Sequence, residues 1–248
     1  MSSLSLLGLV FFILVMIGAF AVRSAAGFGA VLIAMPMLAF VLPISTAVSV
    51  TTALTAITSL HQLSRDWRRV AWRDFAIMAA YSAIGIGLGF YFITMLNEQA
   101  LRDSLGVFLI LYSVYALATA KVSHTVSARW RGPLAAGTGI AGGLLGTLFG
   151  AGVGPIYVVY FNALRLEREI FRVTMSTVVL LGGAARIAGY ASFGFYERSS
   201  IALIAIGLPL VVVGSWLDDR VIRKLDPQRF SWLVAGLILL SGVALLLK

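Results

Sequence analysis

The stretch Gly150-Ala151-Gly152-Val153-Gly154-Pro155 interrupts apolar sequence, with residues 144–145 before it and residues 156–161 after it. A glycine costs about 1 kcal/mol and a proline about 3 kcal/mol in a helix interior, so the stretch predicts a broken helix. Inside a bilayer, the backbone groups that such a break frees must find partners in protein or beside a wet cavity. The stretch therefore predicts either a binding site or a closely packed seam. A related interruption, Gly27-Phe28-Gly29 followed by Pro36, lies earlier in the chain.

The composition indicates an all-α polytopic membrane protein. Hydrophobic residues make up 60% of the 248 residues and charged residues 12%, about half the share of a soluble domain. The apolar runs do not alternate as the strands of a membrane β-barrel would. The chain has no cysteine, which excludes disulfides, thiol catalysis and thiolate metal sites. Its two histidines, His61 and His124, are too far apart in sequence to suggest a ligand pair, so we expect neither a metal nor a cofactor.

Apolar runs divide the chain into ten candidate membrane segments. They lie at residues 4–22, 26–42, 44–64, 74–95, 101–120, 133–149, 153–164, 170–193, 200–217 and 230–247. We interpret the first as a retained helix rather than a signal peptide, because no basic residue precedes it and more segments follow. A full crossing needs about 20 residues, so 26–42, 133–149 and 153–164 are short. These three touch the glycine breaks, and they are either tilted half-helices or re-entrant hairpins.

Basic residues are concentrated in four loops, at residues 65–73, 121–131, 165–172 and 218–229. Cytoplasmic loops carry an excess of lysine and arginine, so these four are expected inside and the charge-poor loops outside. If all ten segments cross, all four basic loops fall inside and both termini fall outside. The charge rule therefore favours ten passes, five in each half. The net charge of +9 is explained by these loops, and no nucleic-acid partner is expected.

The two halves of the chain, residues 1–122 and 123–248, show a weak repeat within a single membrane domain. The matched positions, 123 residues apart, are Gly27 with Gly150, Gly29 with Gly152, and Val50-Thr51 with Val173-Thr174. Five crossings per half turn the second half over, and the loop charges invert accordingly. Inverted-topology repeats with paired glycine- and proline-interrupted segments are typical of secondary transporters. The alternative is chance similarity between two glycine-containing helices.

Two arginines lie inside or beside apolar runs. Arg186 lies within the eighth segment, and a charge in a membrane helix is by default a functional hypothesis because it is costly. Arg23, next to the first break, either shares this role or marks the cytoplasmic end of the first helix. All ten acidic residues lie in loops or at segment ends. A buried arginine must therefore pair with another anion or with carbonyl groups of a broken helix, which predicts a small anionic substrate.

Hydroxyl groups and freed backbone N–H groups complete the predicted anion site. Small hydroxyl side chains follow each break at helical spacing, although helix packing is the alternative role for any one of them. Helix N-termini after the breaks add N–H donors and positive dipole. His61, with Gln62 beside it, either carries a proton with the substrate or is a polar residue at a helix end. The predicted substrate-binding residues are Arg23, Gly27, Gly29, Thr51, Thr52, His61, Gln62, Gly150, Gly152, Gly154, Pro155, Thr174, Thr177 and Arg186.

The chain resembles the sulfite exporter TauE/SafE family of membrane transporters over essentially its full length. The matching features are Gly27-Phe28-Gly29 with Pro36, the Thr51-Thr52 helix, the stretch 149–155 and the helix at 173–177. The chain departs from the usual family pattern at Ala30-Val31, where more glycine is common. The resemblance implies a carrier in the plasma (inner) membrane that exports sulfite or organosulfonates. Family members are often described with seven or eight passes, fewer than the ten expected here.

Three functions compete. The first is export of a small oxyanion, sulfite or an organosulfonate, by alternating access, with the anion and the lipid bilayer as partners. The second is an anion channel, or an importer of another sulfur oxyanion or a small carboxylate. The third, a membrane enzyme or assembly subunit, is disfavoured because the sequence offers no nucleophile–base pair, metal cluster or phosphate loop. We expect no enzymatic activity and leave a homodimer open.

Overall fold

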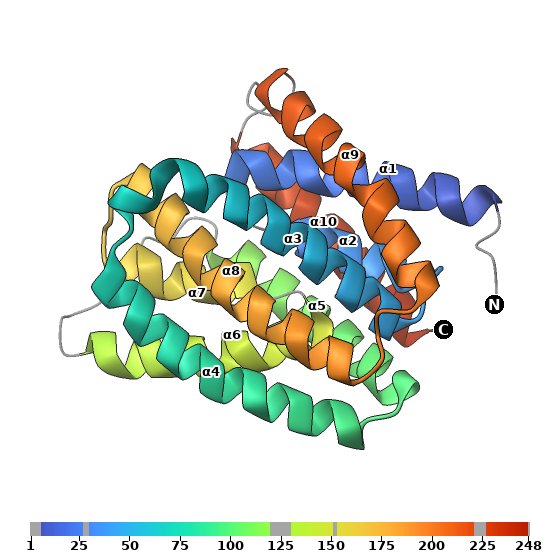
Figure 1. Cartoon of the computed structure of the whole chain (residues 1–248), viewed down its shortest axis with the longest axis horizontal. Helices are drawn as coiled ribbons and strands as arrows, with labels where there is room; N and C mark the ends of the chain where they lie inside the picture. The colour runs from blue at the N-terminus through green and yellow to red at the C-terminus, as the bar shows by residue number, and fades with distance from the viewer. Residues whose placement is uncertain (1–5, 27–29, 120–129, 151–152, 221–226, 248) are drawn as a thin grey trace.

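The computed structural model describes residues 6–26, 30–119, 130–150, 153–220 and 227–247, apart from a few side chains within helices. All regular elements in these residues are helical (Figure 1). They are α1 (Leu6–Ala26), α2 (Ala30–Leu38), α3 (Ile44–Asp66), the 3-10 helix η1 (Trp67–Arg69), α4 (Trp72–Met95), α5 (Glu98–Thr119), α6 (Arg131–Phe149), α7 (Val153–Ala163), α8 (Arg168–Ser192), α9 (Arg198–Arg220) and α10 (Pro227–Leu246).

The ten segments expected from the sequence correspond one to one to the α-helices of the described residues, with shifted ends at the breaks. α1 continues to Ala26, further than expected. α2 has only 9 residues, because it begins after the first break and passes into turns beyond Leu38. Gly154 and Pro155 do not interrupt a helix but belong to the first turn of α7. Proline is tolerated there because the N–H that it lacks would have no partner within the helix.

The surface of the helix bundle suits lipid. Four helical stretches of the described residues are long and apolar enough to cross a membrane, namely Trp72–Met95, Glu98–Leu117, Arg131–Phe149 and Glu169–Ser192. Shorter apolar stretches lie in α1, α9 and α10. Large apolar side chains such as Leu111 and Val212 are well over half exposed. α3 is different, because it buries the hydroxyl groups of Ser49, Thr51 and Thr52 and is therefore an interior helix.

α3 and α8 pack against each other in the middle of the bundle, between the α1–α9 pair and the α4–α6 pair (Figure 1). They run antiparallel. Near the end of α3, Gln62 accepts a hydrogen bond from the Ser176 hydroxyl near the start of α8, at 2.7 Å. Near the start of α3, the Ser49 hydroxyl lies 3.5 Å from the Phe195 carbonyl beyond the end of α8.

α5 and α10 form a second antiparallel pair. A Cβ added at Gly106 of α5 would meet the side chain of Leu246 at 2.9 Å. A Cβ added at Gly242, one turn earlier in α10, would meet Ile110, one turn later in α5, at 3.1 Å. The contact point moves forward by one turn in α5 as it moves back by one turn in α10, so the two helices run in opposite directions.

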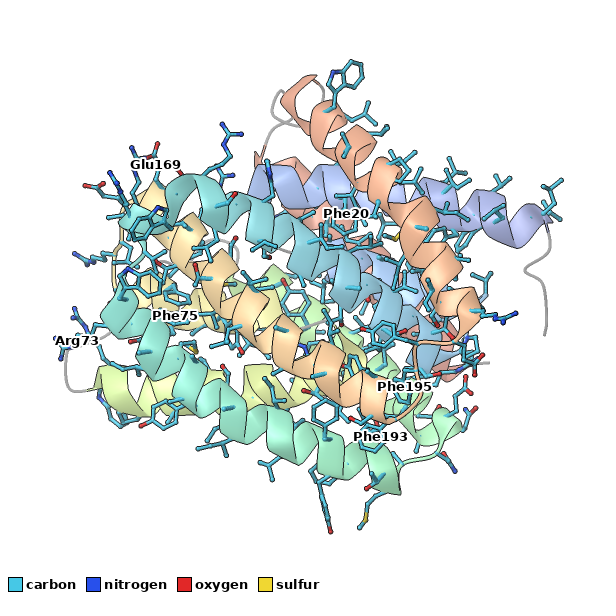
Figure 2. All side chains as sticks on the ribbon, viewed as in Figure 1. Phe20, Arg73, Phe75, Glu169, Phe193 and Phe195 are labelled. Carbon is cyan, nitrogen blue, oxygen red and sulfur yellow. The ribbon has the colours of Figure 1, made fainter. Side chains whose placement is uncertain are left out.

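The two ends of the bundle differ chemically (Figure 2). One end, which we call the arginine-rich end, is formed by η1 and by the starts of α4 and α8, where Arg69 and Glu169 form an ion pair. The opposite end, which we call the aromatic end, is formed by the connection between α8 and α9, with Phe193 and Phe195. The aromatic rings at this end pack together: Phe90 of α4 stacks on Phe193, with ring centroids 5.7 Å apart.

Several helix–helix contacts occur again when each helix is replaced by the helix five places away in the chain, so that α1 is replaced by α6, α2 by α7, and so on. α1 packs on α9 as α6 packs on α4, and α1 packs on α2 as α6 packs on α7. α3 packs on α9 as α8 packs on α4. The pairs α3–α8 and α5–α10 map onto themselves. The exchange describes these main pairs only, because the contact between α2 and α10 has no comparable counterpart between α7 and α5 among the described residues.

The same relation holds for single backbone atoms at two glycines. A Cβ on Gly85 of α4 would lie 2.1 Å from the carbonyl oxygen of Ile140 and 2.8 Å from the nitrogen of Leu144, both in α6. A Cβ on Gly214 of α9 would lie 2.8 Å from the carbonyl oxygen of Ile17 and 3.1 Å from the nitrogen of Ala21, both in α1. The two contacted residues of α1 precede those of α6 by 123 positions, the offset seen in the sequence.

The close seam between α4 and α6 predicts a sharp contrast between two glycines of α4. Gly85→Ala should lower the free energy of unfolding by about 1–3 kcal/mol, because its methyl group would collide with backbone atoms of α6. Gly87→Ala should cause no loss, because no atom lies within 4 Å of its Cβ position. Thermal unfolding of the two purified variants in detergent measures the difference. Equal melting temperatures would show that the helices are not in backbone contact.

Candidate functional site

Arg186 of α8 is buried, with 3% of its surface exposed. Gly182, one turn earlier, leaves room for the guanidinium: a Cβ there would lie 3.3 Å from Nη1 and 3.6 Å from Cδ1 of Ile86 in α4. Side chains on a helix lean towards the preceding turn, so the guanidinium lies along α8, facing α4. In the described part of the chain, its Nε and Nη1 atoms have no hydrogen-bond partner.

Thr52 of α3 lies at the same depth as Arg186. The two helices touch where Gly183 faces Ala56, and a Cβ on Gly183 would lie 3.4 Å from the Cβ of Ala56. Thr52 precedes Ala56 by one turn, while Arg186 follows Gly183 by about one turn in the antiparallel helix. Thr52 is 4% exposed, and its Oγ1 meets no strict hydrogen-bond geometry among the described residues, although it lies close enough to interact with the Tyr190 phenol. Two buried polar groups therefore lie at one level of neighbouring helices.

Gly150 joins this level to the second helix break. α6 ends at Gly150, which has a φ of +61°, a left-handed conformation that glycine adopts without steric strain. A Cβ at Gly150 would lie 3.3 Å from Oγ1 of Thr51 and 3.5 Å from Oγ1 of Thr52. It would also lie 3.4 Å from Val31 in the first turn of α2. The start of α2 and the end of α6 thus meet beside the same turn of α3.

Tyr190, one turn after Arg186 on α8, stabilises the end of α6. Its side chain is wholly buried, and its hydroxyl donates to the carbonyl oxygen of Thr147 at 2.6 Å. The last four carbonyl groups of a helix have no partner within that helix, and in lipid each must find one elsewhere. The Tyr190 hydroxyl therefore satisfies a carbonyl that the break at Gly150 would otherwise leave unpaired.

Tyr157 of α7 and Ser82 of α4 form a buried hydroxyl pair near the guanidinium. The Tyr157 hydroxyl and the Ser82 Oγ are 2.7 Å apart. The tyrosine ring covers Gly142 of α6, where a Cβ would lie 2.2 Å from its Cε1. Ser82 precedes Ile86 by one turn, so it lies on the face of α4 that Ile86 turns towards the guanidinium. The charge of Arg186 also acts electrostatically on the Tyr157 phenol.

No carboxylate of the described residues pairs with Arg186. The two ion pairs found there lie at helix ends, one at η1 and one at the start of α5. Burial raises the pKa of Tyr196, in the connection after α8, to about 12, and the nearby charge of Arg186 opposes that rise. Tyr196 therefore stays neutral at physiological pH and does not supply a counter-charge.

Four of the residues predicted from the sequence lie away from this level. Gln62 is bonded to a serine hydroxyl of α8 at 2.7 Å, and His61 is exposed, both in the last turns of α3. Thr174 accepts a hydrogen bond from the N–H of Ala71 at 3.0 Å, at the arginine-rich end. The Thr177 hydroxyl donates to a carbonyl of its own helix at 2.7 Å. The structure does not bring these four together with Arg186, whereas it does gather Thr51, Thr52 and Gly150.

Other predictions fall where the structure gives no description. These are Gly27, Gly29 and Gly152, together with the side chains of Arg23 and Pro155. Gly154 lies in the first turn of α7, whose leading N–H groups have no acceptor within that helix.

Sequence reasoning missed Ser82, Thr147, Tyr157 and Tyr190. A tyrosine in an apolar segment indicates packing when nothing else is known, and Ser82 lies beside a ladder of glycines. The available signal was helical spacing, because Tyr190 follows Arg186 by one turn and shares its helix face. Only the packing of α4, α6 and α7 reveals the hydroxyl pair.

Comparisons with known proteins agree with the apolar helices. A family model described as Sulfite exporter TauE/SafE matches residues 11–245. The chain is also similar to the probable inner membrane transporter protein TsaS of Comamonas testosteroni, with 23% identity over 181 residues, 73% of this chain and 74% of the relative. No solved structure matches the chain. The matched region spans all the residues described in this site.

The hydrogen bond from Tyr190 predicts a stability change without a change in shape. Tyr190→Phe should lower the free energy of unfolding by about 1–3 kcal/mol, because the buried Thr147 carbonyl loses its donor. Tyr91→Phe on α4 is the matched control, since Tyr91 is 56% exposed. Thermal unfolding in detergent measures both. A Tyr190→Phe protein as stable as the control would show that the carbonyl is satisfied in another way.

Proposed function

Because the chain belongs to the sulfite exporter TauE/SafE family, we propose that it exports a small sulfur oxyanion, sulfite or an organosulfonate, by alternating access. Family membership makes it a membrane transporter. The name of the similar Comamonas protein and the apolar helices agree with a multi-pass protein of the plasma (inner) membrane. The choice of an anion as substrate rests on the chemistry of the site.

The observation that carries the proposal is the buried guanidinium of Arg186, which has two nitrogen atoms without partners in the described part of the chain. A charge removed from water costs several kcal/mol unless a counter-charge compensates it. Arginine does not avoid this cost by losing its proton. A bound anion supplies the counter-charge, and the planar guanidinium fits two oxygens of one oxyanion at once.

Neighbouring groups support an oxyanion in particular. The buried hydroxyl of Thr52 lies at the depth of Arg186, and the start of α7 offers N–H groups without acceptors in their own helix and the positive end of a helix dipole. These donors are neutral, so they add hydrogen bonds without adding charge. Arg23, whose side chain is outside the described residues, stays a prediction as a second cation.

The helix packing supports an inverted repeat as the basis of alternating access. Exchange of α1–α5 with α6–α10 reproduces the main helix pairs, though not the contact of α2 with α10, and the pairs α3–α8 and α5–α10 run antiparallel. Helices related by a two-fold axis along the membrane normal would be parallel. An axis in the membrane plane relates antiparallel helices, which is the arrangement of inverted-topology transporters. In this proposal the short helices α2 and α7 bring the two breaks to mid-depth from opposite sides.

The role of Arg186 predicts loss of transport on neutralisation. Arg186→Gln should lower the initial rate of radiolabelled sulfite entry into liposomes by about 100-fold or more, because the buried anion loses its counter-charge. Arg102→Gln is the control, since Arg102 pairs with Glu98 at the start of α5. Internal unlabelled sulfite should accelerate entry in the unmodified protein. Sulfite flux through Arg186→Gln at the rate of the control would remove the residue from the site, and absence of acceleration would indicate a channel.

The proposed topology predicts which helix ends face the cytoplasm. The chain contains no cysteine, so single cysteines can be introduced without background. Arg68→Cys and Glu167→Cys, at the arginine-rich end, should react with an impermeant thiol reagent only from the cytoplasmic side. Gln99→Cys and Glu197→Cys should react only from the outside. Labelling of Arg68→Cys and Glu167→Cys from opposite sides would overturn the ten-pass arrangement.

A further inference from the structure

The buried pair of Tyr157 and Ser82 has two hydroxyl protons, and one of them has no acceptor within the pair. Each hydroxyl carries one proton, and the 2.7 Å contact between the two oxygens uses only one of them. Tyr157 is 1% exposed and Ser82 is 2% exposed, so water does not readily accept the other proton. A buried donor without an acceptor is costly, which makes the second proton available to a ligand.

The pair lies near the Arg186 guanidinium, whose charge acts on the Tyr157 phenol. A Cβ atom added at Gly182 would be close to both Nη1 of Arg186 and Cδ1 of Ile86, so the guanidinium and the Ile86 side chain lie near each other. Ser82 is one turn from Ile86 on the same face of α4. Gly142 lets the ring of Tyr157 lie flat against α6, so the phenol reaches across to Ser82 and does not point into lipid.

We propose that the Tyr157 hydroxyl is a second, uncharged ligand of the transported anion and that Ser82 positions it. Ser82 donates to the phenolic oxygen, and the phenolic O–H donates to an oxygen of the anion that Arg186 holds. This assignment rests on the proposed function of the Arg186 site and deepens it by naming what selects the substrate. A guanidinium alone attracts any small anion, whereas a fixed second donor favours an anion with several oxygens directed at separate donors.

The consequence is selectivity for oxyanions over halides. A chloride ion is a single sphere that can sit against the guanidinium without the phenol. An oxyanion that loses the phenol has one of its oxygens buried without a donor. Removal of the phenolic O–H should therefore weaken sulfite binding much more than chloride binding.

The test compares anion binding and transport in Tyr157→Phe, which keeps the ring over Gly142 and removes only the hydroxyl. The apparent Kd for sulfite, from ligand-induced thermal shift of the purified full chain, should rise about tenfold or more. The Kd for chloride should change less than threefold, so the sulfite-to-chloride selectivity falls. Flux in liposomes should show the same loss of preference. Tyr160→Phe is the matched control on α7, because the Tyr160 hydroxyl donates to Asp74 at 3.1 Å near the arginine-rich end.

A second variant guards against misfolding of the first. Ser82→Ala keeps the phenol and removes its positioning partner, so the sulfite Kd should rise by a few-fold. In a Tyr157→Phe background, Ser82→Ala should add nothing further, because it acts through the phenol. Additive effects of the two substitutions would overturn the positioning role of Ser82.

The outcomes separate this inference from the proposed function. If Arg186→Gln abolishes sulfite binding while Tyr157→Phe keeps the sulfite affinity and selectivity of Tyr160→Phe, the inference is wrong and the proposed function stands. If Arg186→Gln binds and transports sulfite normally, the proposed function fails and this inference fails with it. A parallel loss of sulfite and chloride affinity in Tyr157→Phe would also overturn the inference, because it would indicate a general change in the site.

Discussion

A buried guanidinium that has no carboxylate partner among the described residues is the constraint on which the rest of this structure depends. Arg186 lies in a helix whose neighbours offer hydroxyl groups and glycines rather than acids. Gly182 leaves space for the side chain, and the helix ends that meet nearby expose backbone dipoles. A protein that only needed to be stable would gain by replacing this charge with an apolar side chain. This cost is the reason for proposing a ligand of opposite charge.

Glycine serves two separate purposes around this site. At Gly150 a positive φ ends α6 deep in the bundle and brings its last turn to Thr51 and Thr52. At Gly85 and Gly143 the glycines lie within regular helices, where the missing side chain lets α4 and α6 touch through their backbones. Gly150 therefore ends a helix, whereas Gly85 and Gly143 allow the neighbouring helices to pack closely around that helix end.

Much of the fold could be predicted from the sequence, because apolar runs and basic loops follow directly from the physics of a bilayer. The ten α-helices of the described residues correspond to the ten expected segments, while the repeat at an offset of 123 residues stays a prediction. Prediction was less accurate at the first break, where α1 ends at Ala26 and α2 begins at Ala30, than at the second, where α6 ends and α7 begins as expected. Local sequence rules do not show whether the next helix begins before or after a glycine.

The site was predicted less completely than the fold. Arg186, Thr52 and Gly150 were singled out because a charge, a hydroxyl and a break each stand out in apolar sequence, and the structure places them close together. His61 was singled out for its chemistry, yet it is exposed in the last turns of α3. Tyr157 and Tyr190 were missed because their roles depend on which helix lies opposite them, and that information is carried by tertiary packing alone. A tyrosine becomes recognisable as a polar group only once its hydroxyl partner is known.

The glycine seam between α4 and α6 has a consequence for how the molecule can move. α4 belongs to the first half of the sequence and α6 to the second, and their backbones are in direct contact, as are those of α1 and α9. Two helices packed backbone to backbone can slide or separate only at a large cost in packing energy. In any large motion, each rigid body therefore contains helices from both halves of the sequence. Hinges therefore belong in the connections between these paired helices, and the two halves of the sequence do not move as separate bodies.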